Sequence, residues 1–189
     1  TPEGEDATTF WGEGDEAIVK YANAICDTID KYGYDGFDYD YEPNYGHRGN
    51  ISGVPAAEKV FVEALSRRLG PKSGTDKMLV IDGEPQTINS ELGPCFNYFI
   101  VQAYQCTGDA NLDGRLQGTI MNFNGVLEPE EVAKKYIVTE NFENFALAGG
   151  VSFTDRNGNE MMSLEGMARW QPIINGKKVQ KGGIGTYHM

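Results

Sequence analysis

The chain has 189 residues, of which 40% are hydrophobic and 23% charged, as is typical of a globular protein with a sizeable core. Its 16 Lys and Arg residues against 28 Asp and Glu residues give a net charge of −12. A negative field opposes binding to nucleic-acid phosphates and to anionic membrane surfaces, so we expect neither partner. No apolar stretch approaches the roughly 20 residues that a membrane-spanning helix needs. The composition therefore favours a neutral partner.

The first predicted elements are a loop and a long helix. Residues 1–16 are polar and predict the loop. Asp15 offers an N-cap, apolar residues then recur at helical spacing, and Gly33 ends the helix. The stripe expected to be buried comprises Ile18, Tyr21, Ala22, Ile25, Cys26, Ile29 and Tyr32.

A strand and a second helix come next. Residues 34–42 alternate aromatic side chains with carboxylates at the two-residue period of a strand, which Pro43 ends. Pro55 and Gly70 then bracket a helix over residues 56–69.

The second half of the chain alternates short apolar strands with helices. Residues 78–81 and 98–104 predict strands buried on both faces, and residues 136–139 a weaker one. We further expect helices over 128–135 and 164–170, a hairpin turning at Asn157-Gly158, and a last strand over 182–189. This alternation predicts an α/β protein with a parallel sheet.

The three cysteines indicate neither a disulfide framework nor a zinc site, because they are odd in number and lack C-x-x-C spacing. We interpret Cys26 as a buried small hydrophobe. A bond between Cys95 and Cys106 stays open at this point.

The acidic strand carries the strongest functional signal. Asp38, Asp40 and Glu42 stand at every second position, so a strand turns all three to one face, roughly 6.6 Å apart. The intervening aromatic residues must then pack on the other face, which makes this a core strand on which a row of acids is costly. Crowded carboxylates also share protons, and this drives their pKa values apart. The pattern therefore favours acid/base catalysis over a solvated face.

Metal binding is the alternative interpretation of these acids, because three carboxylates can hold Ca²⁺ or Mg²⁺. Glu42, just before Pro43, is better placed as a single projecting acid, and we expect no metal and no cofactor. Residues 109–114 and 155–160 resemble calcium loops, but Ile120 and Gly166 stand where the twelfth-position Glu belongs. We predict turns there.

Residues 35–42, Asp-Gly-Phe-Asp-Tyr-Asp-Tyr-Glu, match the D-G-x-D-x-D-x-E signature of glycoside hydrolase family 18 at every fixed position. The chain thereby resembles the chitinases and endo-β-N-acetylglucosaminidases of that family. Residues 101–104 are similar to the sixth strand of the family's barrel. Residues 163–189, ending Gly-Ile-Gly-Thr-Tyr-His-Met, resemble the end of the barrel in a bacterial, Bacteroides-type group.

The resemblance implies a (β/α)₈ TIM barrel, with catalytic groups at the carboxyl ends of its strands. The barrel's strands four to eight would be residues 34–42, 78–84, 98–104, 136–141 and 183–188. A complete barrel needs about 250 residues. We therefore expect residues 1–189 to be the C-terminal portion of one barrel domain. The missing N-terminal part, or another partner covering the two open edges, would be needed for stability.

The resemblance also implies roles for individual residues in a substrate-assisted retaining mechanism. Glu42 would be the acid and base, Asp40 would hold the substrate's acetamido group, and Asp38 would share a proton with Asp40. Gln102 and Tyr104 would steady that group. Other polar residues or tryptophans could contact sugar, or could equally be caps and packing: Trp11, His47, Asp82, Glu84, Glu140, Asn141, Trp170, Tyr187 and His188.

The implied activity is endo-β-N-acetylglucosaminidase cleavage of the GlcNAc-β-1,4-GlcNAc core of N-linked glycans. Chitin is the alternative substrate, and a catalytically inactive, lectin-like glycan-binding protein is the alternative class. The intact carboxylates favour the enzyme. The resemblance also implies an extracellular, periplasmic or cell-surface protein, although residues 1–6 do not resemble a signal peptide.

Overall fold

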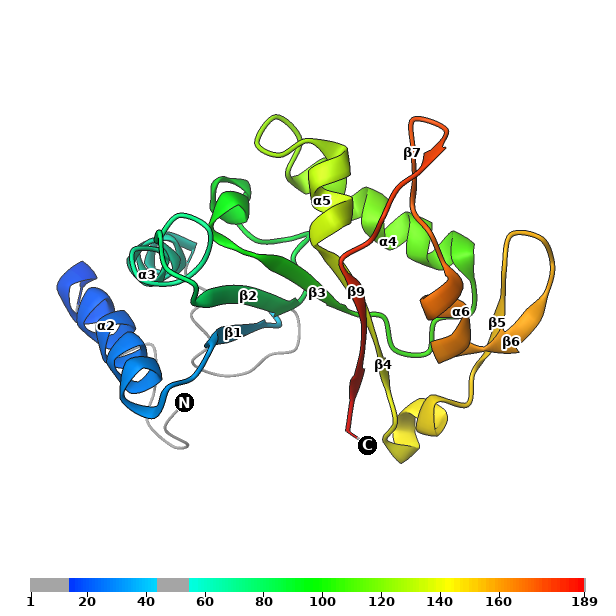
Figure 1. Cartoon of the computed structure of the whole chain (residues 1–189), viewed down its shortest axis with the longest axis horizontal. Coiled ribbons are helices and arrows are strands. Elements are labelled where there is room, and N and C mark those ends of the chain that lie inside the picture. Colours follow the sequence, from blue (N-terminus) through cyan, green and yellow to red (C-terminus); the bar gives the residue numbers. More distant parts are fainter. Residues whose placement is uncertain (1–13, 44–54, 189) are drawn as a thin grey trace. The chain divides into compact units, whose positions relative to one another are not determined.

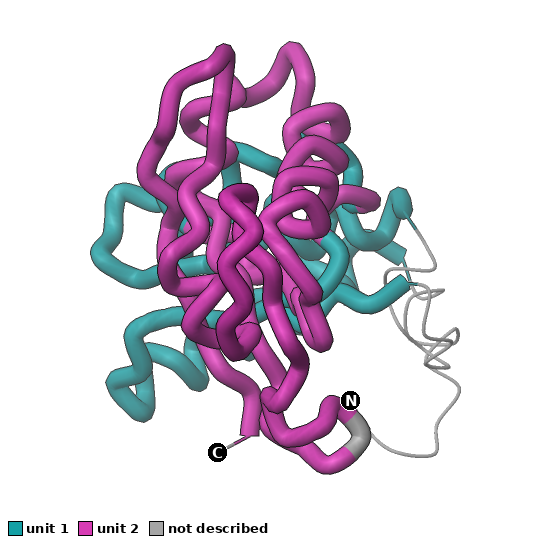
Figure 2. Tube along the Cα trace, turned by 90° about the vertical axis from the view of Figure 1, so that its right-hand side faces the viewer, with its two compact units in different colours: residues 1–84, 88–97 teal, residues 85–87, 98–189 magenta. Residues whose placement is uncertain are grey.

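The computed structural model describes residues 14–43 and 55–188 (Figure 1). The chain divides into two compact units, Thr1–Glu84 with Ile88–Asn97, and Pro85–Thr87 with Tyr98–Met189 (Figure 2). We call them unit 1 and unit 2 and describe each by itself. Both combine parallel strands with helices, as the alternation predicts.

Unit 1 is built on two parallel strands. Its elements are α2 (Asp15–Tyr32), β1 (Gly36–Tyr41), α3 (Pro55–Ser66), β2 (Met78–Gly83) and the 3₁₀ helix η2 (Ser90–Cys95). Tyr39 of β1 packs edge-on against Phe61 of α3 with ring centroids 5.8 Å apart, so one face of β1 is covered by helix. Helices α2 and α3 lie side by side (Figure 1).

Helix α2 ends as predicted, but its N-cap lies one residue earlier than predicted. Gly14 is the N-cap, and Asp15 lies inside the first turn, where its negative charge stabilises the positive end of the helix dipole. Gly33 adopts the left-handed conformation, with φ of 70°, and closes the helix. The buried stripe is narrower than predicted, because Tyr32 is 60% exposed and Tyr21 is also exposed.

Unit 2 holds three parallel strands, with β4 between β3 and β9. Its elements are β3 (Tyr98–Gln102), α4 (Asp109–Asn122), α5 (Pro129–Lys135), β4 (Tyr136–Asn141), η3 (Asn144–Gly149), β5 (Ser152–Thr154), β6 (Glu160–Met162), α6 (Ser163–Arg169), β7 (Ile173–Ile174), β8 (Lys177–Lys178) and β9 (Gly183–Tyr187). Phe99 stacks on Phe123 with ring centroids 4.8 Å apart, and Tyr136 meets Trp170 at 6.2 Å, so the carboxyl ends of α4 and α6 cover one face of β3 and β4. The predicted hairpin is β5–β6, with Gly158 in the left-handed conformation at its turn.

The prediction of a turn at residues 109–114 is wrong, because this segment begins helix α4. Leu112 and Leu116 are buried at helical spacing. Gly114 and Gly118, which each cost a helix about 1 kcal/mol, obscured the pattern. At residues 155–160 the predicted turn is present: the Asp155 carboxylate accepts hydrogen bonds from the backbone N–H groups of Asn157 and Asn159, at 2.8 and 2.9 Å.

Burial on both faces, predicted for the apolar strands, is wrong for β2 and β3. In β2, Leu79 and Ile81 are fully buried, whereas Met78 is 39% exposed and Val80 half-buried. In β3, Phe99 and the other residues on its face are covered while the alternate positions are not. The helices therefore cover one face of β2 and of β3 and leave the other more open, whereas β4 is buried along both faces, as predicted.

All three cysteines are buried free thiols, so Cys95 and Cys106 form no disulfide. Burial raises the pKa of Cys26, which lies on the stripe predicted for it. In residues 14–43 and 55–188, no helix is both long and apolar enough to cross a bilayer.

Candidate active site

The pleat of β1 separates its acids from its aromatic residues. Tyr39 and Tyr41 are buried on the face that meets α3, whereas Asp38 and Asp40 are exposed on the opposite face. Alternation of successive side chains across a strand produces this separation. The two acids thus share one open face, as their spacing predicts.

Glu42 follows the last residue of β1 and is half-buried. The backbone of Tyr41 accepts a hydrogen bond from the N–H of Glu84, which ties the ends of β1 and β2 together. Gly83 has a φ of 107°, and a Cβ there would lie 2.3 Å from the Tyr41 carbonyl oxygen and 3.3 Å from the Glu42 Cγ. The absence of a side chain at Gly83 therefore makes room for the stem of Glu42.

The glycine of the signature has a packing role. A Cβ on Gly36 would lie 2.2 Å from the carbonyl oxygen of Met78, its partner residue on β2. Non-bonded atoms repel strongly at such a separation, so only glycine lets the two strands pair in this register. The backbone N–H of Met78 donates to the Asp35 carbonyl at the same point.

A fourth carboxylate belongs to the same face. Asp82 of β2 stands in register with Asp40, on a neighbouring strand about 4.8 Å away. Residues paired in a parallel sheet point to the same side, so Asp82 joins the open face that Asp38 and Asp40 share. Partial burial raises the pKa of Asp38, and the charge of Asp40 raises it further. A raised pKa favours retention of a proton by Asp38.

Behind the acidic face, β1 is fastened to α3 by a buried hydrogen bond. The Tyr39 hydroxyl donates to Glu58 Oε1 at 3.0 Å, and Glu58 is almost fully buried. Burial raises the pKa of Glu58 to about 7, and the hydrogen bond from Tyr39 partly opposes that rise. Glu58 is not among the predicted site residues, although its position on the apolar stripe of α3 was a usable signal.

In unit 2, the open face of the strands carries the other predicted site residues. Gln102 is in register with Thr139, which pairs in turn with Gly185, two residues before Tyr187. Gln102 and Tyr187 therefore belong to one face. Tyr104, just beyond β3, lies with its ring centroid 6.4 Å from that of Tyr187. The three predicted side chains are thus gathered at the carboxyl ends of the strands, and Tyr187 is 53% exposed.

Two other strand-end residues of unit 2 are closed to solvent. Glu140 and Asn141 are buried, and both make hydrogen bonds within the unit. Trp170 is packing: it is buried against Tyr136, and its Nε1 donates to Asp113 at 2.9 Å. Trp11 and His47 lie outside the described residues.

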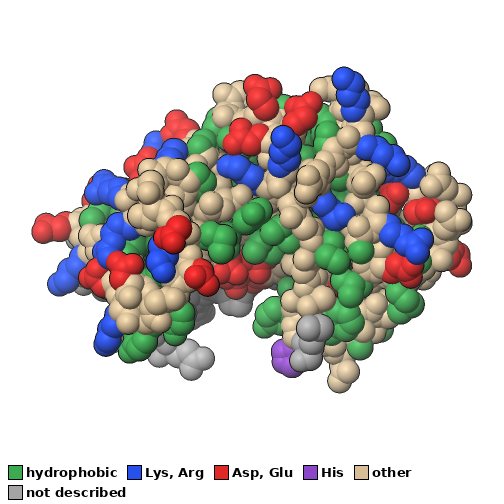
Figure 3. Space-filling model, in the orientation of Figure 1, with side chains coloured by type: hydrophobic (Ala, Val, Ile, Leu, Met, Phe, Trp, Pro, Cys, Tyr) green, Lys and Arg blue, Asp and Glu red, His purple; other side chains and the backbone are tan. Residues whose placement is uncertain are grey.

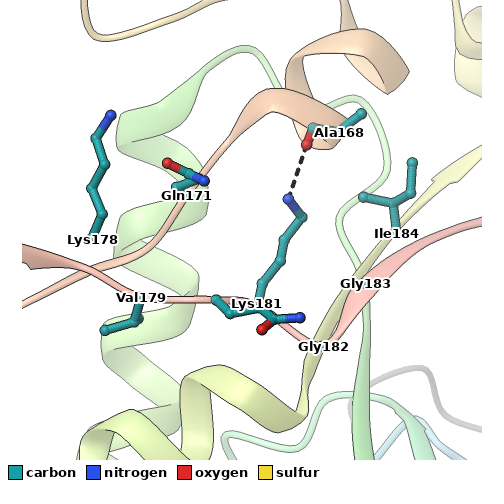
Figure 4. Close-up of a pocket in the computed structure, with 9 residues that line it drawn as sticks. Ala168, Gln171, Lys178, Val179, Lys181, Gly182, Gly183 and Ile184 are labelled. Atoms are coloured by element: carbon teal, nitrogen blue, oxygen red, sulfur yellow. Dashed lines mark hydrogen bonds between the residues drawn. The ribbon is translucent and has the colours of Figure 1, made fainter.

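A cavity of about 600 Å³ in unit 2 lies away from these strand ends (Figure 4). Its lining includes Gly183, the first residue of β9, whereas Tyr187 is the last. The Lys181 ammonium there donates to the carbonyl oxygens of Ala168 and Trp170, at 3.0 and 2.6 Å, and so caps the end of α6. Burial lowers the pKa of Lys181. This cavity is separate from the candidate site.

The charged side chains on one face of the described residues do not gather by sign. On the face drawn in Figure 3, basic and acidic side chains are interspersed. Within the described part of the chain, no group of three or more His, Cys, Asp or Glu side chains is arranged to hold a metal ion.

Several known proteins are similar to this chain in sequence or fold. The family model described as "Glycoside hydrolase family 18, BT1044-like" matches residues 5–189. Endo-beta-N-acetylglucosaminidase F2 of Elizabethkingia meningoseptica is 29% identical over 198 residues, 96% of this chain and 50% of that protein. A Glu-to-Gln variant of BT1044 superposes with a TM-score of 0.78 at 33% identity, over 100% of this chain and 59% of that one.

A fungal structure shares the fold at lower identity. An endo-beta-N-acetylglucosaminidase variant from Cordyceps militaris, in complex with fucosyl-N-acetylglucosamine-Asn, has a TM-score of 0.62 at 22% identity. The similarity extends over 92% of this chain and 53% of the Cordyceps militaris chain. The chain therefore spans between half and three fifths of the relatives that it matches.

Proposed function

The chain belongs to the BT1044-like group of glycoside hydrolase family 18, and on that premise we propose that it forms the catalytic part of an endo-β-N-acetylglucosaminidase. The bond that it would cleave is the GlcNAc-β-1,4-GlcNAc linkage in the core of N-linked glycans. The observation that carries the proposal is the open face of β1, where Asp38 and Asp40 lead to Glu42 at the strand's end. The likeness to endo-beta-N-acetylglucosaminidase F2 supports this bond over the linkages of chitin.

The proposed reaction is substrate-assisted. Glu42 donates its proton to the glycosidic oxygen while the carbonyl oxygen of the substrate's 2-acetamido group attacks the anomeric carbon. The bond to the leaving sugar breaks, and an oxazolinium ion forms. A water molecule then attacks the anomeric carbon and gives its proton to Glu42, so the configuration is retained and the acid is regenerated.

The other two acids of β1 would stabilise that intermediate. Asp40 would accept a hydrogen bond from the acetamido N–H and balance the positive charge of the oxazolinium ion. Asp38 would hold the proton that it shares with Asp40, and its raised pKa is consistent with this part. Gln102, Tyr104 and Tyr187, gathered on one face of unit 2, would contact the acetamido group and the sugar.

We further propose that β1, β2, β3, β4 and β9 are strands four to eight of a (β/α)₈ barrel. Their parallel pairing, with β1 beside β2 and β4 between β3 and β9, agrees with that order. The carboxyl ends of barrel strands carry the catalytic groups in such enzymes, and Glu42 follows the carboxyl end of β1. The N-terminal part of the barrel would then be the partner of this segment. An extracellular, periplasmic or cell-surface location would suit a glycoprotein substrate.

The decisive test is mass spectrometry of a high-mannose glycoprotein after incubation with the full-length protein. We expect a product that keeps one N-acetylglucosamine on each asparagine. Glu42→Gln should lower the rate by about 10³-fold or more, because it removes the proton donor but keeps the side chain's shape. Glu128→Gln is the matched control, since Glu128 is exposed and its side chain makes no capping hydrogen bond to α5.

Two other results would replace this function with an alternative. Release of N-acetylglucosamine oligomers from chitin, with the glycoprotein left intact, would make the protein a chitinase. Unchanged substrates, together with retained glycan binding, would make it a lectin-like protein. An active Glu42→Gln variant would refute the assignment of the acid.

A further inference from the structure

A carboxylate that the proposed reaction does not use is buried in unit 2. Glu140, the penultimate residue of β4, has an exposed fraction of 0%. Its Oε1 accepts two hydrogen bonds, from the backbone N–H groups of Gln105 at 3.0 Å and Asn141 at 2.9 Å. Its Oε2 has no hydrogen-bond partner among the described residues. Burying an acid with one oxygen unsatisfied costs free energy, so its position needs an explanation.

The bond to Gln105 crosses between segments that are 35 residues apart. It holds the turn that follows β3, in which the N–H of Cys106 donates to the carbonyl of Ala103. Gln105 has a φ of 57°, in the left-handed region that a residue with a side chain rarely adopts. Such a conformation costs of order 1 kcal/mol and persists only where its surroundings impose it. The Glu140 carboxylate accepts the N–H of this residue and so helps to hold it in this conformation.

The residue next to the strained one is Tyr104. The path of the backbone at Gln105 sets the direction from which Tyr104 leaves β3, and therefore its approach to Tyr187. The second hydrogen bond fixes Asn141, whose register partner on β9 is also Tyr187. One carboxylate thus fixes the backbone beside each member of the Tyr104–Tyr187 pair.

We propose that Glu140 is a positioning residue: its hydrogen bond from the Gln105 N–H holds the Gln105 turn against β4, beside Asn141, and so places the Tyr104 ring next to Tyr187. The proposal rests on the proposed function, because it takes Tyr104 as a contact of the reacting acetamido group. Glu140 acts through the backbone and touches no substrate. A side chain that aligns a group for an intermediate alters turnover more than it alters substrate binding.

The test compares three variants of the full-length protein, Glu140→Ala, Glu140→Gln and Glu140→Asp. Glu140→Ala removes the acceptor. Glu140→Gln keeps one carbonyl oxygen for both N–H groups. Glu140→Asp keeps the charge but withdraws the acceptor by about one C–C bond, roughly 1.5 Å. The aspartate variant also provides the test if the alanine variant does not fold. Glu160→Ala, which removes an exposed acid from β6, is the matched control.

Amide hydrogen exchange and steady-state kinetics are the two measurements. With Glu140→Ala or Glu140→Asp, we expect the Gln105 amide to exchange about tenfold faster or more, because it loses its acceptor. We also expect kcat to fall about tenfold while KM changes less than about threefold. For Glu140→Gln, the Gln105 exchange rate and kcat should stay within about threefold of the parent values. Glu160→Ala should change neither.

Two results would overturn the proposal. Unchanged exchange at Gln105 in both disruptive variants would mean that the carboxylate does not hold the turn. Faster exchange with unchanged kcat would mean that the turn does not place Tyr104. If the parent protein cleaves no glycan, the proposed function fails instead. The exchange data then decide the role of Glu140, which is refuted if exchange at Gln105 is unchanged in both disruptive variants.

Discussion

The two units fix their strand-end groups by different means. In unit 1, the pleat of β1 turns Asp38 and Asp40 to one face and buries Tyr39 on the other, so local alternation is sufficient. In unit 2, hydrogen bonds between residues far apart in the chain hold the corresponding positions, as between Gln105 and Glu140. The face of a strand can therefore be predicted from neighbouring residues. The conformation of the loop beyond the strand cannot.

This difference between the units predicts that chemistry and folding are separable at Asp40. Asp40→Asn keeps the shape of the side chain on the open face, so it should lower kcat by about 10²-fold, or roughly 3 kcal/mol in activation free energy. The melting temperature should stay the same or rise, because repulsion with Asp38 falls. Parallel activity and thermal melting measurements check this expectation. A large drop in melting temperature would show that Asp40 also supports the strand.

At Gly36 we expect a loss of stability, because a side chain there would disrupt the pairing of β1 with β2. A Cβ on Gly36 would lie 2.2 Å from the Met78 carbonyl, so Gly36→Ala should destabilise the protein by about 3 kcal/mol. Urea denaturation measures this loss. Gly74→Ala is the useful comparison for steric fit, since a Cβ there meets nothing within 4 Å, although its positive φ adds strain. Equal losses in the two variants would contradict the clash.

Glu58, which accepts the hydrogen bond from Tyr39 behind β1, predicts a pH dependence of stability. The pKa of Glu58 is raised to about 7 from 4.5, so between these values the folded chain holds a proton that the unfolded chain releases. The free energy of unfolding should therefore fall as pH rises from about 4.5 to 7, with a contribution from Glu58 of about 3 kcal/mol. Above pH 7 this contribution should be constant.

Glu58→Gln isolates this contribution, because the amide oxygen can still accept the Tyr39 hydroxyl. The variant should lose stability less steeply over this pH range and exceed the parent at about pH 8. Urea denaturation of both proteins from about pH 5 to 8 measures the difference. Parallel curves would exclude a titration of Glu58 in that interval.

The smallest effect is expected for the ion pairs that join distant segments of unit 2. Arg156 of the β5–β6 turn pairs with Asp109 and with Asp113 of α4, at 3.2 and 3.0 Å. Asp113→Asn keeps an acceptor for the Trp170 indole but removes the charge, so we expect a loss of about 0.5–1 kcal/mol that shrinks in high salt. Thermal melting at two salt concentrations checks it. A loss independent of salt would assign the effect to the Trp170 bond.

Much of the fold could be predicted from periodicity. The alternation in β1, the stop at Gly33 and the turn around Gly158 are encoded by adjacent residues, and the structure confirms all three. Helix α4 escaped prediction because its stability comes from tertiary packing of residues such as Leu112, despite two interior glycines.

The candidate site divides in the same way. The spacing of Asp38 and Asp40 is enough to predict their common face. The partners of Asp40 and Tyr39 come from other elements: Asp82 from β2 by register, and Glu58 from α3 by packing. The role of Glu140 depends on a contact across 35 residues. Such contacts leave no periodic signal in a single sequence.

The separation of acids from core on β1 has an evolutionary consequence. Side chains on the open face contribute like-charge repulsion and no apolar burial, so their replacement relieves repulsion while it removes the proposed chemistry. Loss of activity at these positions carries no folding penalty for selection to act against. If the proposed function holds, a lineage with this scaffold can change from cutting glycans to binding them without passing through an unstable ancestor. The aromatic face of the same strand, which the core requires, would change far more slowly.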